Sequence, residues 1–340
     1  MPSLKFINAL NRVNQNVPPI WLMRQAGRYH SHYQNLKSNY TFEDLCKNPD
    51  LSAETAMGPI NDFDFDVAIL FSDILFPLEA LGMDLSYNPG PKFEEFLNSD
   101  NIGKLFSSVD PIKFLQFQSE AIIKTLDRLP SDKSMIGFIG GPWTLLAFAC
   151  GINKHQDTKY LTEFHKNCIR DYLLPLLKQN IELQLSAGAE LVMIFDSSAH
   201  QIKDVDYNNY ISDIFFSLIE PFSQRVGYYA KDGVNHNRLI QLAKDNPGSL
   251  AGVGVDSHVN IQLVLQDASD YFVQGNFNES FLTLPFNEFC SELDKYIITL
   301  KTLSVSERAG WVCGLGHGVL KTSQQENVRF FVQRIREAFK

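Results

Sequence analysis

Two arginines stand close together in the run Trp21–Tyr29, which reads Trp-Leu-Met-Arg-Gln-Ala-Gly-Arg-Tyr. Arg24 and Arg28 flank the small pair Ala26-Gly27, and a short apolar segment precedes them. A guanidinium is a planar, permanently charged fork that binds carboxylates with two hydrogen bonds. The run therefore favours a site for an anion with several carboxylates, and its alternative is a surface turn that carries two solvated arginines.

A single carboxylate, Asp73, lies among apolar neighbours in the sequence Phe71-Ser72-Asp73-Ile74-Leu75. Burying a carboxylate costs free energy unless it accepts hydrogen bonds or faces positive charge. Asp73 is therefore either a structural acceptor of backbone N–H groups or an anion with a function.

A histidine, His317, is surrounded by glycines in the run Trp311–Gly318. Glycines let a ligand approach the backbone closely, and a histidine at such a place can bind an anion or act as an acid or base. The alternative is a histidine that caps a turn. The glycine spacing does not match a phosphate-binding loop.

Other histidines give weaker signals. His30 and His32 have no cysteine or carboxylate at ligand spacing, so we predict no metal site there. His200 follows Asp196 and Ser197, but no Gly-x-Ser-x-Gly motif surrounds the serine, which disfavours a serine nucleophile.

The composition limits the class of protein. The chain has 340 residues, of which 44% are hydrophobic and 20% are charged, as is typical of globular proteins. A net charge of −9 argues against nucleic acid and anionic membranes as partners. The five cysteines are scattered without a Cys-x-x-Cys pair, and we see neither a signal peptide nor a membrane span. We therefore expect a cytoplasmic protein.

Short apolar runs alternate with segments of helical character along the whole chain. The predicted strands are Ile20–Met23, Val67–Phe71, Met135–Ile139, Leu191–Phe195, Val226–Tyr229, Leu250–Val255, Tyr271–Gln274 and Trp311–Gly314. Runs that are apolar throughout suit parallel strands that are covered on both faces. Eight such strands alternating with helices predict an α/β fold, a single-domain (β/α)₈ TIM barrel, with an open doubly wound sheet plus an appended domain as the alternative.

The helical segments carry their own signals. We predict a helix over Thr41–Met57 and another over residues 158–187 that Pro175 kinks or divides. The last helix is predicted to open with a capping box at Ser323-Gln324-Gln325-Glu326. Residues 86–112 have the character of a long surface excursion.

Polar or glycine-rich groups follow nearly every predicted strand. In strand order they are Arg24 with Arg28, Ser72-Asp73, Gly140-Gly141, Asp196-Ser197, Lys231-Asp232, Asp256, Asn276 and His317. The carboxyl ends of barrel strands converge on one rim, where barrel enzymes place their active sites. The sequence therefore predicts one site at that rim.

Several motifs together resemble the uroporphyrinogen decarboxylase family. They occur in order across nearly the whole chain, as MRQAGRY (Met23–Tyr29), DVAILFSDIL (Asp66–Leu75), GFIGGPWTL (Gly137–Leu145), VMIFDS (Val192–Ser197), VQGN (Val273–Asn276) and LGHG (Leu315–Gly318). The resemblance implies a single-domain barrel over residues 1–340, usually a homodimer, that needs no metal or organic cofactor. It also implies conversion of the four acetate side chains of uroporphyrinogen to methyl groups, which yields coproporphyrinogen and CO₂.

The resemblance also implies roles for individual residues. Arg24 and Arg28 would bind substrate carboxylates, and Gln25, Ala26 and Gly27 would line the cleft. Asp73 would accept hydrogen bonds from the pyrrole N–H groups and stabilise a protonated ring, while Ser197 and His317 would contact peripheral carboxylates. The candidate proton donors are Arg24, Arg28 and a bound water molecule.

The chain departs from the family pattern at several positions. Phe148 stands where the family usually has a tyrosine beside the substrate, and His30-Ser31-His32 replaces the usual Leu-Pro-Glu. A lost hydroxyl costs roughly 0.5–1.5 kcal/mol, which predicts slower turnover rather than none. Related methyltransferases bind zinc through a His-x-Cys pair that this chain lacks. The remaining alternative is a non-catalytic tetrapyrrole-binding homologue.

Overall fold

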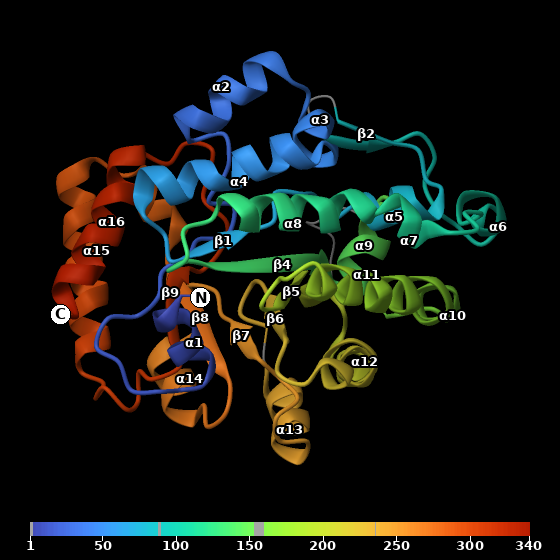
Figure 1. Ribbon diagram of the computed structural model, residues 1–340. Helices are drawn as coiled ribbons and strands as arrows, with labels where there is room; N and C mark the ends of the chain where they lie inside the picture. The colour runs from blue at the N-terminus through green and yellow to red at the C-terminus, as the bar shows by residue number, and fades with distance from the viewer. Residues whose placement is uncertain (1–2, 88–89, 153–159, 235) are drawn as a thin grey trace.

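Seven parallel strands form one curled sheet in the computed structural model, which describes residues 3–87, 90–152, 160–234 and 236–340 (Figure 1). In their order across the sheet the strands are β1 (Val67–Ile69), β4 (Ser134–Gly140), β5 (Val192–Asp196), β6 (Val226–Ala230), β7 (Gly252–Gly254), β8 (Phe272–Phe277) and β9 (Trp311–Leu315). All pairs are parallel. Seven of the eight predicted strands are thereby confirmed, with ends that shift by at most three residues.

The remaining predicted strand is the first one in the chain, Ile20–Met23. It forms only one β-bridge in the described residues, from Ile20 to Cys313 of β9. On its other side the Ile20 carbonyl accepts a hydrogen bond from the backbone N–H of Asp66, at 2.9 Å, just before β1. The Ile20 N–H is taken by the Asp66 carboxylate, and the chain then turns at Leu22. The prediction of a regular strand here is wrong because the Asp66 side chain replaces a backbone partner on the β1 side and the chain turns at Leu22.

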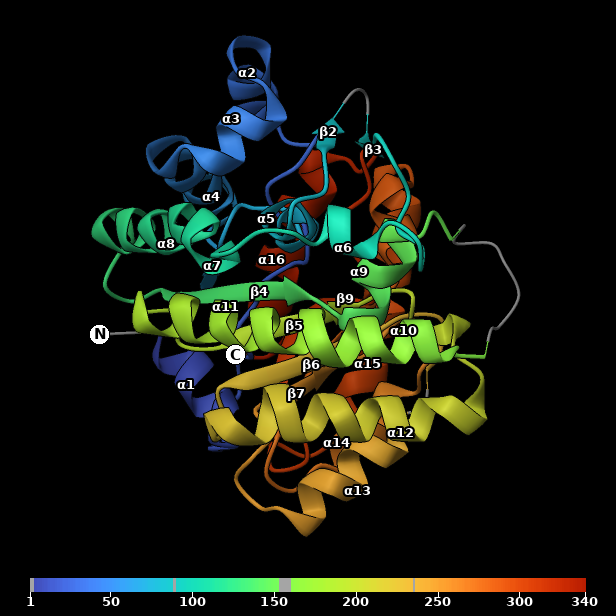
Figure 2. The same cartoon turned by 90° about the vertical axis from the view of Figure 1, so that its right-hand side faces the viewer.

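Helices surround the outer face of the sheet, and Figure 2 shows α11 and α12 lying across it. The α-helices are α1 (Leu4–Leu10), α2 (Ser31–Asn39), α3 (Phe42–Lys47), α4 (Pro49–Phe63), α5 (Phe76–Leu81), α6 (Ile102–Leu105), α7 (Pro111–Phe114), α8 (Gln116–Arg128), α9 (Pro142–Ala149), α10 (Glu163–Cys168), α11 (Leu174–Ser186), α12 (Asp204–Ile214), α13 (Asn237–Asp245), α14 (Ile261–Asp267), α15 (Phe286–Lys301) and α16 (Gln325–Ala338). Short 3₁₀ helices are η2 (Ala199–Gln201), η4 (Glu220–Phe222) and η5 (Glu279–Thr283), and π-helical turns are η1 (Ile169–Leu173) and η3 (Phe215–Ile219). The strands are buried between these helices and the interior side chains, which explains their continuous apolar character.

The predicted helix over Thr41–Met57 is in fact two helices, α3 and α4. Pro49 disfavours helical backbone at Asn48, so α3 ends there and α4 begins. The Asn48 side chain accepts hydrogen bonds from the first N–H groups of α4, and Thr41 forms a capping box at the start of α3. Proline therefore decides the boundary that apolar periodicity alone missed.

The predicted helix over residues 158–187 begins at Glu163 instead, and it continues past Pro175 without a break because the π-helical turn η1 joins α10 directly to α11. A proline has no backbone N–H, and the wider π turn accommodates its ring within the helix. A second π turn, η3, precedes Pro221 in the same way. Residues 158 and 159 lie outside the described part of the chain. The predicted capping box at Ser323 is wrong, because α16 begins two residues later with Gln324 as its N-cap and without a side-chain capping bond.

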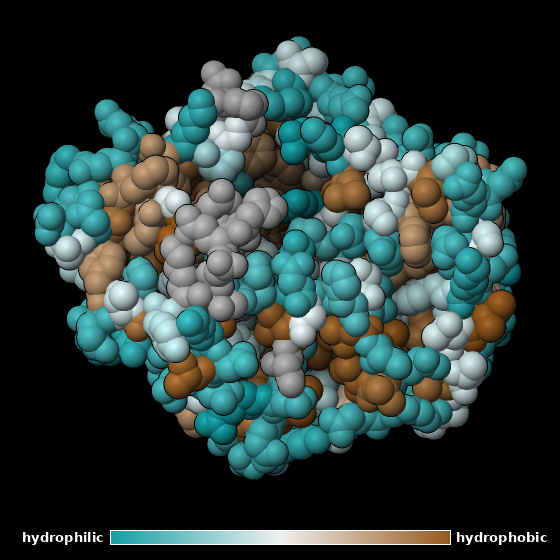
Figure 3. Space-filling view, turned by 180° about the vertical axis from the view of Figure 1, so that it is seen from behind, coloured by the Kyte–Doolittle hydropathy of each residue, from teal (hydrophilic) through white to brown (hydrophobic). Residues whose placement is uncertain are grey.

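The predicted excursion over residues 86–112 contains a small antiparallel hairpin of β2 (Leu85–Tyr87) and β3 (Pro91–Phe93), followed by α6 and α7. The segment follows α5 and brings Tyr87 close to the loop after β1. In the described residues no helix is long and apolar enough to cross a membrane. The face seen in Figure 3 has a recess with apolar walls and hydrophilic residues around its mouth.

Candidate active site

A cavity lies at the carboxyl ends of the strands and encloses about 180 Å³, or about 840 Å³ with its open mouth included. Its walls are formed by Met23, Arg24, Gln25, Ala26, Ile69, Leu70, Phe71, Ser72, Asp73, Ile74, Phe138, Phe195, Ser197, Tyr229, His317 and Gly318. Six of the predicted site residues are among them: Arg24, Gln25, Ala26, Asp73, Ser197 and His317. The predicted convergence of polar groups on one rim is therefore present for these residues.

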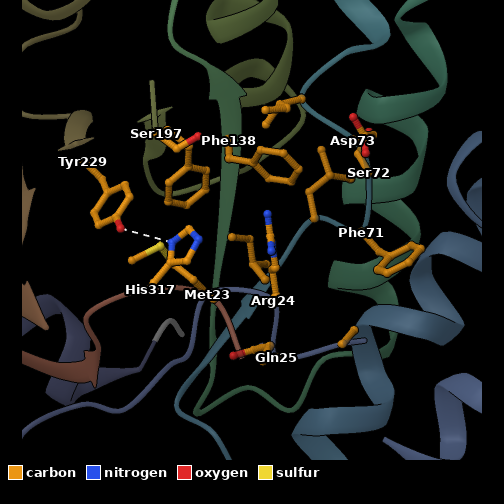
Figure 4. A pocket seen from close by; sticks show the side chains of 16 residues that line it. Met23, Arg24, Gln25, Phe71, Ser72, Asp73, Phe138, Ser197, Tyr229 and His317 are labelled. Atoms are coloured by element: carbon orange, nitrogen blue, oxygen red, sulfur yellow. Dashed lines mark hydrogen bonds between the residues drawn. The ribbon is translucent and has the colours of Figure 1, made fainter. Parts of the chain in front are cut away.

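The Arg24 guanidinium extends into the cavity, with Ser72 and Asp73 on one side and Ser197 and His317 on the other (Figure 4). Arg24 adopts a left-handed backbone conformation with φ of 58°, which costs a residue with a Cβ about 1 kcal/mol or more. Its side chain lies over Gly318, where a Cβ would come within 2.5 Å of the Arg24 Cδ atom. Gly318 is therefore a steric requirement for the position of Arg24.

Gln25 anchors the arginine segment from below. It is buried, its Nε2 group donates to the Val67 carbonyl at 3.0 Å, and its Oε1 atom accepts from the Leu22 N–H at 3.2 Å. The Tyr29 hydroxyl donates to the Gln25 carbonyl at 2.7 Å. These bonds tie the loop to β1, so that the strained backbone of the neighbouring arginine is held in place.

Arg28 and Gly27 do not line the cavity. Arg28 is exposed and lies beside Tyr33, where its charge opposes the rise that burial causes in the pKa of the tyrosine. Within the described ranges, neither Arg24 nor Arg28 forms an ion pair with an acidic side chain. Contact of Arg28 and Gly27 with a substrate stays a prediction.

His30 supports this segment where the family pattern is broken. It is fully buried, and its backbone N–H donates to the Gly27 carbonyl at 2.9 Å. The Nε2 atom of its ring lies 2.7 Å from the Asp62 carboxylate. Burial lowers the pKa of His30, and the hydrogen bond to Asp62 opposes that shift. His32 in turn contacts the Glu54 carbonyl at 3.2 Å. The unusual histidines therefore dock α2 against α4.

Asp73 is a structural acceptor of a backbone N–H, the first of its two predicted alternatives, and its role as a functional anion stays a prediction. Its Oδ1 atom accepts a hydrogen bond from the Leu75 N–H at 2.9 Å, and the half-buried carboxylate faces the cavity. Burial, together with this carboxylate, raises the pKa of the neighbouring Tyr87. The adjacent Ser72 accepts a hydrogen bond from Gln118 at 3.1 Å. The loop after β1 is thus fixed with an anion at the cavity wall.

The apolar wall came from residues that we did not single out from the sequence. Phe138 of β4 and Phe195 of β5 have ring centroids 5.7 Å apart, and Tyr229 of β6 lies 6.0 Å from Phe195. Three successive strands each contribute one inward-pointing ring. The available signal was the position of each ring, one or two residues before the polar or glycine group that follows its strand.

Asp196, at the end of β5, lies beneath the cavity wall rather than in it. The fully buried carboxylate accepts hydrogen bonds from the Thr144 hydroxyl at 2.6 Å, from Tyr210 and from Tyr228. Burial raises its pKa, and these bonds oppose the rise. A Cβ on Gly141 would collide with the carboxylate. Asp196 therefore holds the loop before α9 and sets the position of Ser197.

Phe148 lies outside the cavity. It belongs to α9 and lines a separate hollow with Phe93 of β3, Phe96 and Ile152. A role of Phe148 in substrate contact stays a prediction.

Three ligand-type side chains at the rim, Asp232, Asp256 and His258, have atoms within 4.8 Å of one another. The buried Asp256 already accepts hydrogen bonds from the backbone N–H groups of Gly233 and His258, at 2.7 and 3.0 Å. Asp232 faces Lys231 at 3.3 Å. These partners account for the carboxylates, so the cluster does not require a metal.

The fold and the cavity together define the class: an α/β protein with a curled parallel sheet, whose strand ends surround an apolar cavity that carries one guanidinium, one carboxylate and one histidine. The comparisons agree with this description. The chain belongs to the uroporphyrinogen decarboxylase family, which matches residues 1–338.

The similar proteins support the family over the full length. The uroporphyrinogen decarboxylase of Orientia tsutsugamushi (strain Ikeda) is 32% identical over 350 residues and is covered to 98%, as is this chain. That of Myxococcus xanthus (strain DK1622) is 31% identical, with 97% of this chain and 95% of the relative covered. A solved methyltransferase from Methanosarcina mazei has a TM-score of 0.70 at 16% identity over 98% of both chains, which shows a shared fold.

Proposed function

We propose that this protein is a uroporphyrinogen decarboxylase that converts uroporphyrinogen III to coproporphyrinogen III in heme biosynthesis. The observation that carries the proposal is the common cavity of Arg24, Asp73, Ser197 and His317 in a chain that belongs to the family. Four polar groups of these kinds around apolar walls suit a flat macrocycle with acidic side chains at its periphery.

The proposed chemistry uses protein groups alone. Loss of CO₂ from a pyrrole acetate needs an electron sink, and protonation of the neighbouring ring carbon supplies one. The C–C bond to the carboxylate then breaks, and its electron pair forms an exocyclic double bond that neutralises the ring. A second proton on the exocyclic carbon completes the methyl group, and the ring carbon gives up the first proton to restore the pyrrole, so that one proton is consumed for each CO₂ released. Asp73 stabilises the cationic ring, because a fixed carboxylate in a cavity of low polarity acts strongly on a nearby positive charge.

The arginines and the apolar wall have separate tasks in this proposal. Arg24 holds substrate carboxylates in register, joined by Arg28 as the family resemblance implies, and Ser197 and His317 bind others on the opposite side of the cavity from Asp73. The rings of Phe138 and Phe195 exclude water from the reacting carbon. Each group therefore either orients the substrate or lowers the energy of its charged intermediate.

The quaternary and cellular setting belongs to the same proposal. We propose one (β/α)₈ domain over residues 1–340, in which Ile20 closes the sheet between β9 and β1. A homodimer in the cytoplasm is proposed from the family resemblance and from five cysteines that form no disulfide.

The test is turnover by the purified, chelator-treated protein. It is incubated with uroporphyrinogen III without oxygen, and the porphyrins are separated by chromatography after oxidation. We expect coproporphyrin and intermediates with fewer carboxylates. Binding of the porphyrinogen without any product would reject the enzyme and favour a tetrapyrrole-binding homologue.

A further inference from the structure

The side chain of His317 is held by a partner from another strand, Tyr229 of β6. The Tyr229 hydroxyl oxygen lies 3.1 Å from the His317 Nδ1 atom and 2.9 Å from the Gly316 carbonyl oxygen. Their rings are nearly parallel, with an angle of 10° between the planes. The tyrosine is buried and lines the same cavity, so this contact belongs to the inner surface of the site.

The two contacts of the hydroxyl fix where the hydrogens are. Tyr229 has one hydrogen to donate, and the Gly316 carbonyl can only accept. The hydroxyl therefore donates to Gly316, since the reverse arrangement would leave two oxygen atoms 2.9 Å apart with no hydrogen between them. The tyrosine oxygen then accepts a hydrogen bond from His317, which requires that Nδ1 carries the hydrogen.

A neutral His317 with its hydrogen on Nδ1 has an acceptor at Nε2, and this second nitrogen points toward the cavity (Figure 4). A substrate carboxylate can also only accept hydrogen bonds. The two groups repel each other unless the imidazole gains a second proton at Nε2.

We propose that Tyr229 is a positioning residue that couples the binding of a substrate carboxylate at His317 to the uptake of one proton. This inference rests on the proposed function for the identity of the ligand, while the position of the imidazole hydrogen stands on the geometry alone. Substrate affinity is then highest when His317 is already protonated, and it falls as the pH rises.

Several charged groups surround the pair and act on it. Arg24 and Asp73 face His317 from the loops after the Ile20 bridge and after β1, and they carry opposite charges. Asp232, Asp256 and Glu279 act on Tyr229 from the loops after β6, β7 and β8. Among the described residues, the carboxylates favour an added proton on the imidazole and the guanidinium disfavours it.

The position of the hydrogen is measured in the free protein. Nitrogen-15 labelled histidine gives different NMR shifts for the two neutral forms of the ring, and His317→Gln assigns the signal. We expect hydrogen on Nδ1 in the wild type and a shift toward the Nε2 form in Tyr229→Phe. The Nε2 form in the wild type would overturn the inference, whatever the activity.

The coupling is measured by the pH dependence of KM for uroporphyrinogen. We expect the wild-type KM to rise by up to about tenfold per pH unit above the pKa of His317. In Tyr229→Phe the neutral ring can move its hydrogen to Nε2 and donate to the carboxylate, so the rise becomes less than about threefold, with a smaller change in kcat. His317→Gln, which donates a hydrogen without titrating, removes the dependence.

A matched control lies next to the tested residue. Tyr228→Phe also removes a tyrosine hydroxyl from β6. This hydroxyl donates to Asp196 at 3.1 Å, not to His317. The Tyr228→Phe variant keeps the wild-type pH profile if the inference holds. Equal profiles for Tyr229→Phe and the wild type would refute the coupling, whereas absence of product with the expected NMR result would refute only the proposed function.

Discussion

Substituting Asp73 by asparagine removes one negative charge from the cavity. The asparagine retains an Oδ1 acceptor for the Leu75 N–H, which the aspartate binds at 2.9 Å, so the loop after β1 keeps its anchor. The amide has nearly the same volume as the carboxylate. The variant therefore isolates the charge that we assign to stabilising the protonated pyrrole.

The size of the effect follows from the position of the carboxylate. Two unit charges about 4 Å apart interact with about 4 kcal/mol at the effective dielectric constant of a protein surface. Asp73 is half-buried, and solvent screening reduces this to about 3 kcal/mol, or a loss of about 100-fold in kcat. The porphyrinogen is not yet protonated when it binds, so KM should change by less than about fivefold.

The assay is the initial rate of coproporphyrinogen formation, with porphyrin fluorescence after oxidation as the readout. The matched control is Ser72→Ala, which removes a cavity-lining hydroxyl without changing the charge. The control should retain kcat within about threefold, as expected when one neutral hydrogen bond is lost. If Asp73→Asn also stayed within threefold, the electrostatic role of Asp73 would be refuted.

Four further predictions follow from the same geometry. Arg24→Lys replaces a planar fork with a point charge and should raise KM for uroporphyrinogen about 10-fold or more, which steady-state kinetics will show; an unchanged KM would remove Arg24 from substrate binding. Gly318→Ala places a methyl group against the Arg24 side chain and should raise KM in the same assay, whereas a neutral effect would show that the guanidinium has another route into the cavity. Phe148→Tyr changes a residue outside the cavity and should alter kcat by less than about twofold, so a large gain would bring Phe148 into the site. Burial lowers the pKa of His236 to about 4, against about 6.5 in the unfolded chain, so protonation favours the unfolded state and lowers the free energy of unfolding by about 3 kcal/mol as the pH falls from 6.5 to 4. In urea titrations at pH 7 and pH 4.5, His236→Gln should not show this decrease in the free energy of unfolding. An equal decrease in the variant and the wild type would contradict the assignment.

Much of the fold could be predicted because buried parallel strands are apolar throughout. The runs at Met135–Ile139 and Val226–Tyr229 fall inside β4 and β6, where every residue is buried. The polar residues Asp73, Ser197 and His317 could be placed together for the same reason, since each comes within three residues of the end of such a run. Strand ends that share one rim are a property of topology, and topology follows from the alternation of elements.

Other features depend on contacts that the local sequence does not contain. The Ile20 segment is apolar like a strand, but the side chain of Asp66, 46 residues away, takes its backbone N–H. The sequence marked Tyr229 only as a strand residue. Its contact with His317, which lies 88 residues later in the chain, could not be seen from the local sequence. Arg28 could not be separated from Arg24 by spacing, since only the left-handed backbone at Arg24 turns that side chain into the cavity.

The most direct test of the account is a crystal structure of the protein with coproporphyrinogen III, grown without oxygen. We predict that the macrocycle occupies the cavity between Phe138 and Arg24, with its pyrrole nitrogens directed at the Asp73 carboxylate and one carboxylate side chain at His317. A macrocycle bound elsewhere, for example in the hollow beside Phe148, or bound with its nitrogens turned away from Asp73, would contradict the account.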